Sequence, residues 1–383
     1  MTKDKEYHSR TILQVVPALV TGGVERGTLE IAKKIVDSGI NSIVISAGGP
    51  LVAKLEQGGS KHITLNVASK NPFVIWRNAG KIANIIKNYN VDIVHARSRA
   101  PAWSCYLAAK STGVKLITTF HGIYNFKNGI KKFYNSVMTK GERIIAVSNF
   151  VRDHIINNYA VNKEKVVVIH RGVNFKEFSK DKLSQEVLEK TREKYRVPKD
   201  MKVLLLPSRM TRWKGHLTLI DALAKIKEMD FYCIIAGDLS KHPNFVAEIQ
   251  NKIQEYRIQN RVQLFGNDPK IINLYGIADV IISASVEPEA FGRTIIEAQS
   301  MEKLVIATNI GGACETIQDG TTGFHVKPGD SDDLANKISH CLNIIGTKEE
   351  EKITRMARKT VSENFSLDLM TSKTMDVYDE VLK

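Results

Sequence analysis

Short apolar runs alternate with stretches of helical periodicity along most of the chain. The apolar runs cover residues 12–16, 42–46, 92–95, 115–120, 143–147 and 165–169, and then 203–207, 232–236, 262–265, 280–283 and 304–307. They are rich in Val and Ile and do not alternate with polar residues, which is typical of strands buried on both faces of a parallel sheet. Between them apolar positions recur at helical spacing, for example over 24–36 and 74–86, so the pattern predicts alternating strands and helices.

This alternation breaks once and then restarts. Residues 174–200 are polar and highly charged, and residues 349–383 have a helical pattern without a strand. Two successive β/α arrays predict an α/β protein with two facing, Rossmann-like doubly wound parallel-sheet domains and a C-terminal helical segment. We expect an N-terminal domain over 1–180, a charged connector over 181–200, a second domain over 201–348, and C-terminal helices over 349–383 that pack back towards the first domain.

The charge is unevenly distributed between these two halves. The chain has 383 residues and a formal net charge of +14, yet residues 1–180 carry +16 and the remainder −2. Such asymmetry predicts an anionic partner for the first half, such as a membrane surface, a nucleic acid or a phosphorylated substrate. The sequence has neither an apolar signal segment nor a run of about 20 apolar residues, and this predicts a cytoplasmic chain.

Several loops at predicted strand ends have residues suited to anion binding. Gly22-Gly23 lies between a strand and a helix, where paired glycines allow close approach of a ligand, although a purely structural turn fits equally well. Arg209 and Lys214 lie in the loop after 203–207, before a helix. Two cations beside a helix N-terminus suit a diphosphate; the alternative is a solvated basic loop.

The strongest candidate is the segment from Glu289 to Glu297. Treated as one helix, the eight-residue step covers about 12 Å and leaves the two carboxylates within a quarter turn of each other. One carboxylate could then bind a ribose and the other a sugar, because carboxylates accept bidentate hydrogen bonds from vicinal diols. Phe291 and Gly292 would leave backbone N–H groups free between them. The alternative is that Glu297 faces solvent, as most helical glutamates do.

Two further features call for simpler explanations. His121 follows the run 115–120, and a lone histidine there is more often a local hydrogen-bonding group than a catalyst. Asp330-Ser331-Asp332 has the form of a metal-binding D-x-D, but it follows Pro328-Gly329 and precedes a helical pattern, which indicates an N-cap. The four cysteines are scattered without metal-ligand spacing. We therefore expect no metal and no cofactor.

Taken together, these motifs resemble the retaining glycosyltransferases of family 4, which have the GT-B fold. The segment Glu289–Glu297 matches the family's E-x7-E motif, Arg209 and Lys214-Gly215 its diphosphate-binding pair, Gly22-Gly23 its glycine loop, and His121-Gly122 its sugar-side histidine. Supporting matches include Gly311-Gly312 and residues 319–323. The order and spacing of the whole set are more specific than any single motif.

The resemblance implies a hexosyltransferase that takes a nucleotide diphosphate sugar, expected to be of the UDP type, as co-substrate. Arg209 and Lys214 would hold the diphosphate and stabilise the leaving group, and Glu297 would bind the ribose. Glu289, with the backbone at Phe291 and Gly292, would hold the donor sugar. His121 would contact that sugar from the first domain, while Gly22 and Gly23 let this domain close over the diphosphate. The catalytic set is thus Glu289, His121, Arg209 and Lys214, with either a covalent or a same-face mechanism.

The sequence departs from the family pattern at a few positions. Glu302 and Leu304 stand where the family commonly has Gly and Pro, and Pro288 and Arg293 are unusual beside the motif. None matches a ligand-binding position of the family, although Arg293 could alter donor selectivity.

The acceptor is expected to meet the basic first half. Residues 126–134 combine lysines with aromatic residues, a pattern suited to an anionic lipid interface, or alternatively to a solvated helix face with Phe133 tucked inside. We expect a lipid-linked or envelope-polysaccharide acceptor, such as lipopolysaccharide, and peripheral contact with the inner face of the membrane. The nearer alternative is a nucleotide-sugar epimerase or hydrolase of the same fold. A nucleic-acid-binding protein is the farther one, for which recognition signatures are lacking.

Overall fold

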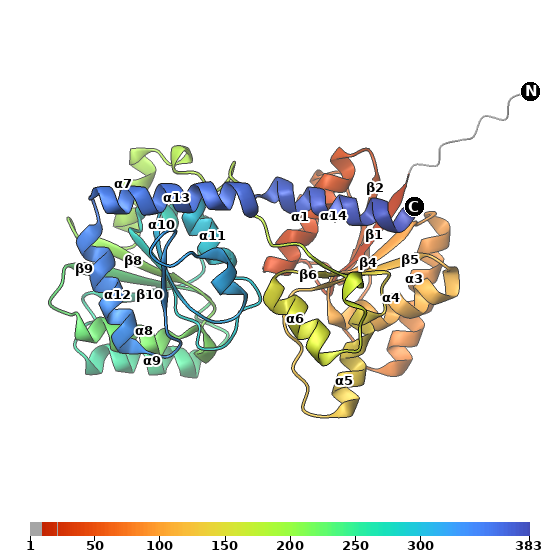
Figure 1. Ribbon diagram of the computed structural model, residues 1–383, viewed down its shortest axis with the longest axis horizontal. Coiled ribbons are helices and arrows are strands. Elements are labelled where there is room, and N and C mark those ends of the chain that lie inside the picture. The colour runs from red at the N-terminus through yellow and green to blue at the C-terminus, as the bar shows by residue number, and fades with distance from the viewer. Residues whose placement is uncertain (1–9, 21) are drawn as a thin grey trace, which may run out of the picture. The chain divides into compact units, whose positions relative to one another are not determined.

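The computed structural model describes residues 10–20 and 22–383. In this part of the chain the strands form two all-parallel sheets, one of seven strands and one of six (Figure 1). The chain divides into two compact units, one comprising residues 1–171 and 368–383 and the other residues 172–367. The predicted fold class, two Rossmann-like parallel sheets with a C-terminal helical segment, is confirmed.

The sheet of the first unit has the strand order β3-β2-β1-β4-β5-β6-β7. Its strands are β1 (Thr11–Val15), β2 (Asn41–Ser46), β3 (Lys61–Thr64), β4 (Ile93–Ala96), β5 (Lys115–Phe120), β6 (Arg143–Ala146) and β7 (Val166–Val168). Its helices are α1 (Gly23–Asp37), α2 (Val52–Gln57), α3 (Pro72–Asn88), α4 (Arg99–Thr112), α5 (Gly129–Ser136), α6 (Asn149–Asn158) and, from residue 368 on, α14 (Leu367–Leu382). Because β1 and β4 are buried throughout, their Val- and Ile-rich sequences fit the centre of the sheet.

The sheet of the second unit has the order β10-β9-β8-β11-β12-β13. The strands are β8 (Lys202–Pro207), β9 (Phe231–Ala236), β10 (Val262–Phe265), β11 (Val280–Ser283), β12 (Leu304–Thr308) and β13 (Phe324–Val326). The helices are α7 (Gln185–Lys194), α8 (His216–Lys225), α9 (Pro243–Glu255), α10 (Ile271–Ile277), α11 (Arg293–Ser300), α12 (Ser331–Ile344) and α13 (Lys348–Asn364). Short 3₁₀ turns span Lys180–Lys182, Arg212–Lys214 and Gly312–Thr316.

Local sequence explains where several helices begin. Asn71 caps α3, with Pro72 as its first residue, and Asn128 caps α5. The Asp330 carboxylate accepts hydrogen bonds from the backbone N–H groups of Asp332 and Asp333, so the predicted N-cap is confirmed. In each case a side-chain oxygen satisfies N–H groups that the first turn of a helix leaves without partners.

Both strands that the sequence analysis missed lie at sheet edges. β3 contains Lys61 and His62 and flanks β2, while β13 has three residues and flanks β12. An edge strand has a neighbour on one side only and tolerates polar side chains, so it lacks the apolar run that marks a central strand.

The charged segment 181–200 is grouped with the second unit. It contains α7, and Leu183 and Leu188 lie so close to Gly276 of α10 that a Cβ there would come within 2.8 Å of each. Tyr195 packs edge-on against Phe265, with ring centroids 4.7 Å apart. These apolar contacts are made by a few residues, which is why the segment looks polar in the sequence.

The last helix, α14, is grouped with the first unit from residue 368 on. The hydroxyl of Tyr378 lies 2.7 Å from Nδ1 of His95 in β4, and Arg143 pairs with Glu380. Of the helices that the structure describes, none is long and apolar enough to cross a bilayer.

Candidate functional site

The loop after β8 is held tightly against the end of β11. Gly215 has φ +72°, and a Cβ there would lie 1.8 Å from the carbonyl oxygen of Ala284. In addition, the backbone N–H of Val286 donates to the carbonyl of Trp213 at 2.7 Å. Only glycine allows both this conformation and this approach. The loop that carries Arg209 and Lys214 is therefore fixed to the segment that carries Glu289.

Lys214 and Glu289 form an ion pair inside this arrangement. Nζ of Lys214 lies 2.7 Å from Oε1 of Glu289, both side chains are 14% exposed, and the Ser285 hydroxyl donates to the same oxygen. Burial lowers the pKa of Lys214, Glu289 opposes this effect, and Arg209 adds to it. The two residues, expected to bind different parts of one ligand, thus contact each other directly.

Arg209 and Lys214 both lie close to the indole of Trp213. The Arg209 guanidinium carbon is 5.3 Å from the ring centroid, and Nζ of Lys214 is 4.3 Å from it. A cation near an indole is attracted by the negative face of the ring. The aromatic ring therefore holds two cations in one short loop, which is the arrangement expected for a diphosphate site.

Glu289 lies outside helix α11, so the helical estimate of its distance from Glu297 is wrong. Glu289 instead forms a parallel bridge with Gly311, and its carbonyl accepts a hydrogen bond of 2.7 Å from the N–H of Gly312. Gly311 has φ +70°, and a Cβ there would lie 2.5 Å from the Glu289 carbonyl oxygen. Gly311-Gly312 thus serves to position the backbone of Glu289.

Glu297 is buried within α11, so the solvent-facing alternative is wrong. Its side chain accepts a 3.1 Å hydrogen bond from the Tyr275 hydroxyl and lies 3.6 Å from Nε of Arg293, and the residue is 7% exposed. Gly292 begins the helix with φ +88°, and Phe291 is buried against Phe365. A buried carboxylate with oxygens available can accept hydrogen bonds from a diol.

The remaining predicted residues belong to the first unit. Gly22 is extended and precedes α1, with its carbonyl accepting from the N–H of Arg26 at 3.1 Å, and Gly23 is exposed. His121 follows β5, and its Nε2 has no hydrogen-bond partner. Burial lowers the pKa of His121 well below 6.5, and Arg171, Arg97 and His95 lower it further. The ring is therefore neutral at pH 7.

The structure places Arg209 and Lys214 beside Trp213 and brings Glu289 into contact with Lys214, with Glu297 in the following helix. Sequence reasoning missed Tyr275 and Ser285, which contact the two glutamates. It also missed Arg97, a buried arginine directly after β4. The rule that ligands bind at the carboxyl ends of parallel strands could have found Arg97.

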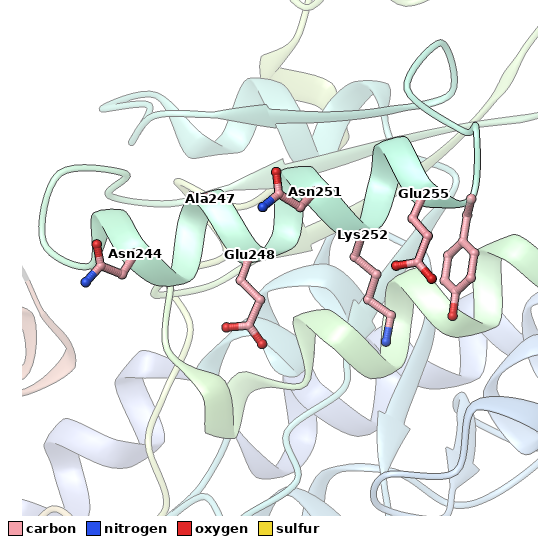
Figure 2. Close-up of a pocket in the computed structure, with 7 residues that line it drawn as sticks. Asn244, Ala247, Glu248, Asn251, Lys252 and Glu255 are labelled. Atoms are coloured by element: carbon pink, nitrogen blue, oxygen red, sulfur yellow. The ribbon is translucent and has the colours of Figure 1, made fainter.

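A pocket on the surface of the second unit contains none of these residues. Figure 2 shows it along α9, lined by Asn244, Ala247, Glu248, Asn251, Lys252, Glu255 and Tyr256. Glu248 already pairs with Arg212, and Lys252 with Asp221, so two of its charged groups are engaged. Among the residues that the structure describes, no group of three His, Cys, Asp or Glu side chains could hold a metal ion.

Two family models match adjoining parts of the chain. The model for glycosyltransferase family 4 matches residues 21–177, and the model for glycosyl transferases group 1 matches residues 187–360. A crystal structure of a glycosyltransferase from Rickettsia africae is 58% identical, with a TM-score of 0.93, over 98% of this chain and 100% of that one. The chain belongs to glycosyltransferase family 4. It has the GT-B fold of this family, whose members use a nucleotide-sugar donor.

More distant relatives of this glycosyltransferase carry informative names. The phosphatidylinositol N-acetylglucosaminyltransferase GPI3 subunit of Saccharomyces cerevisiae is 26% identical, over 94% of this chain and 80% of that protein. The structure of Anabaena Alr3699/HepE in complex with UDP and glucose is 24% identical, with a TM-score of 0.84 over 97% of this chain and all of that one.

One departure from the family pattern has a clear structural consequence. Glu302, where the family commonly has glycine, adopts φ +54°. Its carboxylate pairs with Lys180 and lies 3.6 Å from Nε of Arg358. The glycosyltransferase thus places a strained glutamate at a glycine position and stabilises it with two cations.

Proposed function

We propose that this glycosyltransferase moves a hexose-type sugar, with retention, from a UDP-type sugar donor to a lipid-linked or envelope-polysaccharide acceptor. The observation that supports this most strongly is the partly buried Lys214–Glu289 pair beside Arg209 and Trp213. It combines cations suited to a diphosphate with a carboxylate suited to sugar hydroxyls. The UDP-type donor is supported by the UDP and glucose in the Anabaena structure.

In this proposal the donor diphosphate binds Arg209 and Lys214. Negative charge next to Lys214 raises its pKa again and keeps the ammonium protonated as the sugar–phosphate bond breaks. The two cations then stabilise the charge that develops on the leaving diphosphate, and they require no reorganisation because Trp213 and the Gly215 turn already hold them. Lys214 thereby exchanges part of its contact with Glu289 for the phosphate.

Glu289, released in part from Lys214, binds hydroxyls of the donor sugar, together with backbone N–H groups at Phe291 and Gly292. Glu297 binds the ribose, and Tyr275 orients its carboxylate. The family resemblance assigns His121 to the donor sugar and Gly22 and Gly23 to the diphosphate. The neutral state of His121 suits hydrogen bonding to a hydroxyl and avoids a second cation beside the sugar.

The acceptor side of the proposal rests on α5 and the loop before it. Ile130 is 82% exposed and Phe133 is 67% exposed, although the Phe133 ring lies 5.3 Å from that of Trp103. Lys131 and Lys132 on the same helix are exposed as well. Apolar side chains flanked by lysines suit the surface of an anionic membrane, and this supports peripheral contact of the enzyme with the inner face of a membrane. The yeast relative's name, which refers to phosphatidylinositol, supports a lipid acceptor.

A thermal-shift panel of UDP-, GDP- and ADP-sugars tests the donor assignment. A UDP-sugar should stabilise the wild-type protein, because a ligand that binds only the folded state raises its unfolding temperature. Lys214→Ala and Glu297→Ala should remain folded and lose the shift. Lys225→Ala is the matched control, since this lysine lies on α8 and pairs with Asp332. Full donor binding in both site variants would overturn the site, and turnover of donor without any acceptor would favour a hydrolase or epimerase.

Flotation with phosphatidylglycerol vesicles tests the membrane assignment. Wild-type protein should float at low salt and less so at high salt, because salt screens the lysines. The double variant Ile130→Ser with Phe133→Ser should float less at both salt concentrations. Met356→Ser, which alters an exposed apolar residue of α13, should float like the wild type. Flotation independent of both salt and these residues would contradict the proposal.

A further inference from the structure

A buried arginine at the carboxyl end of a central strand of the first sheet lacks partners for part of its guanidinium group. Arg97 directly follows β4, its backbone N–H donates to the Val15 carbonyl at 2.9 Å, and the residue is 2% exposed. Its Nε and Nη2 are buried and have no hydrogen-bond partner. Among the described residues, no carboxylate forms an ion pair with it.

The groups around Arg97 offer little to offset its charge. His95, in β4, has both ring nitrogens engaged, at 2.7 Å from the Tyr378 hydroxyl and 2.7 Å from the Thr119 hydroxyl. Burial and then Arg97 lower the pKa of His95 well below 6.5, so the ring is neutral. Burial lowers the pKa of Arg97 and outweighs the electrostatic effects of Tyr378 and Glu30, which raise it.

A second guanidinium lies at the same edge of the sheet. Arg171 follows β7 and donates to the carbonyl of Gly23, and it fits so closely against Gly27 of α1 that a Cβ there would lie 2.0 Å from its Nη2. It therefore packs on the first turns of α1, whose N-terminus carries the positive end of the helix dipole. His121, at the end of β5, is influenced by both arginines, and its Nε2 lacks a partner.

These positions coincide with the place where such folds bind ligands. Arg97, His121 and Arg171 follow β4, β5 and β7, and α1 follows β1, so all four lie at the carboxyl edge of one parallel sheet. A guanidinium stays protonated in proteins, so its charge has to be offset by an anion. A sugar hydroxyl could accept its hydrogen bonds but would leave the charge uncompensated.

We propose that Arg97 binds an oxyanion of the phosphate class, carried by a substrate, at the carboxyl edge of the first unit's sheet. The planar guanidinium donates from Nε and Nη2 to two oxygens of the phosphate, the bidentate geometry that arginine favours. This site differs from the donor site proposed above, where the donor's diphosphate binds the second unit. The inference rests on the proposed function only in that it attributes the phosphate to a substrate. The phosphate comes either from the acceptor or from the nucleotide.

Arg97→Met separates a ligand site from a structural role. Inorganic phosphate and UDP are titrated separately by calorimetry at constant ionic strength, together with the unfolding temperature of the ligand-free protein. We expect Arg97→Met to weaken phosphate binding by at least about tenfold, because a charged, bidentate contact is lost. We also expect its ligand-free unfolding temperature to be equal to or above that of the wild type, because an uncompensated buried charge is removed.

A control variant and the two separate titrations, with phosphate and with UDP, distinguish the possible outcomes. Arg152→Met removes an arginine of α6 that already pairs with Asp153, and it should bind phosphate like the wild type. Loss of phosphate binding with UDP binding retained assigns the site to the acceptor, and loss of both assigns it to the nucleotide. Unchanged binding of both ligands in Arg97→Met overturns the proposal, as does a lower unfolding temperature with unchanged phosphate binding.

Arg97→Lys covers the case in which the methionine variant does not fold. It keeps the charge but loses the fork of donors, so it should fold and bind phosphate more weakly than the wild type. Wild-type phosphate affinity in this variant would contradict bidentate binding by Arg97. Failure of the donor site would appear separately, as UDP binding that is insensitive to Lys214→Ala.

Discussion

Two cations, the partly buried Lys214 in the second unit and the buried Arg97 in the first, lie at the carboxyl edges of similar parallel sheets but in different electrostatic states. Lys214 is paired with Glu289 at 2.7 Å, whereas Nε and Nη2 of Arg97 have no hydrogen-bond partner. A paired cation can exchange its partner for a ligand at little cost in stability. An unpaired one makes the ligand-free protein less stable, so its presence points to a function at that position.

The largest effect should come from removing the paired cation. Lys214→Ala should reduce kcat/KM about 10²- to 10³-fold, the range seen when one group that stabilises a developing negative charge is removed. Steady-state kinetics with a UDP-sugar measures this, with Lys225→Ala as the control. A loss of kcat/KM below tenfold would mean that Arg209 binds the diphosphate alone. Lys214 would then be the wrong cation of the second unit to compare with Arg97.

Gly215→Ala should disrupt the loop that carries this cation. The new Cβ would meet the Ala284 carbonyl at 1.8 Å, in a backbone with φ +72°. We expect a loss of about 2–4 kcal/mol in unfolding free energy from left-handed strain and overpacking. Chemical denaturation provides the measurement. Gly266→Ala, with no atom within 4 Å of the new Cβ, should change stability little. Equal stabilities of the two variants would refute the close packing of this loop.

His216 sharpens the comparison through pH. Its ring is fully buried, with Nε2 at 3.1 Å from the Ser208 hydroxyl, and burial lowers its pKa to about 4. In the unfolded chain this histidine has a pKa near 6.5 and binds a proton more readily than in the folded protein. The stability associated with the neutral, buried ring is therefore fully present above pH 6.5 and is lost as the pH falls towards 4.

A difference of one bound proton changes the unfolding free energy by up to about 1.4 kcal/mol per pH unit, so this single histidine accounts for up to about 3 kcal/mol over that range. His216→Gln should therefore flatten the acid limb of the stability profile, measured by denaturation from pH 7 to 4.5. His340→Gln, at a partly exposed site near Glu349, serves as the control. An unchanged acid limb in His216→Gln would show that the ring is not held neutral.

The smallest expected effect concerns Glu302, the strained residue at a family glycine position. Glu302→Ala keeps φ +54° and loses the contacts with Lys180 and Arg358, so we expect a loss of about 1 kcal/mol. Glu302→Gly loses the same contacts but relieves the strain, and it should be more stable than the alanine variant. Thermal unfolding of the two variants measures this difference. A glycine variant that is less stable than the alanine variant would exclude left-handed strain at this position.

The sequence predicted the fold class because it depends on local patterns, and the donor motifs, which stay a prediction, are local patterns too. Central strands such as β1 and β8 are continuous apolar runs, and the glycine turns at Gly215 and Gly292 are adjacent in sequence to the residues they position. The edge strands β3 and β13 escaped prediction because an edge tolerates polar residues. The Lys214–Glu289 contact joins residues 75 positions apart, and no periodicity encodes it.

Arg97 shows the limit in another way. The backbone of Arg97 bonds to β1 and its charge is influenced by Tyr378 of α14, and the sequence around Arg97 reveals neither these neighbours nor the lack of partners for Nε and Nη2. The net charge of +16 over residues 1–180 indicated an anionic partner but not its location. Only the folded structure shows that Arg97 is a buried charge of this half with which no described carboxylate forms an ion pair.

Calorimetric titration of UDP into the wild-type protein and into Lys214→Ala tests the central claim most directly. The account predicts a saturable binding isotherm for the wild type and for Lys225→Ala, and none for folded Lys214→Ala at the same concentrations. An isotherm for Lys214→Ala that matches the wild type would contradict the assignment of the donor diphosphate to the cation that pairs with Glu289.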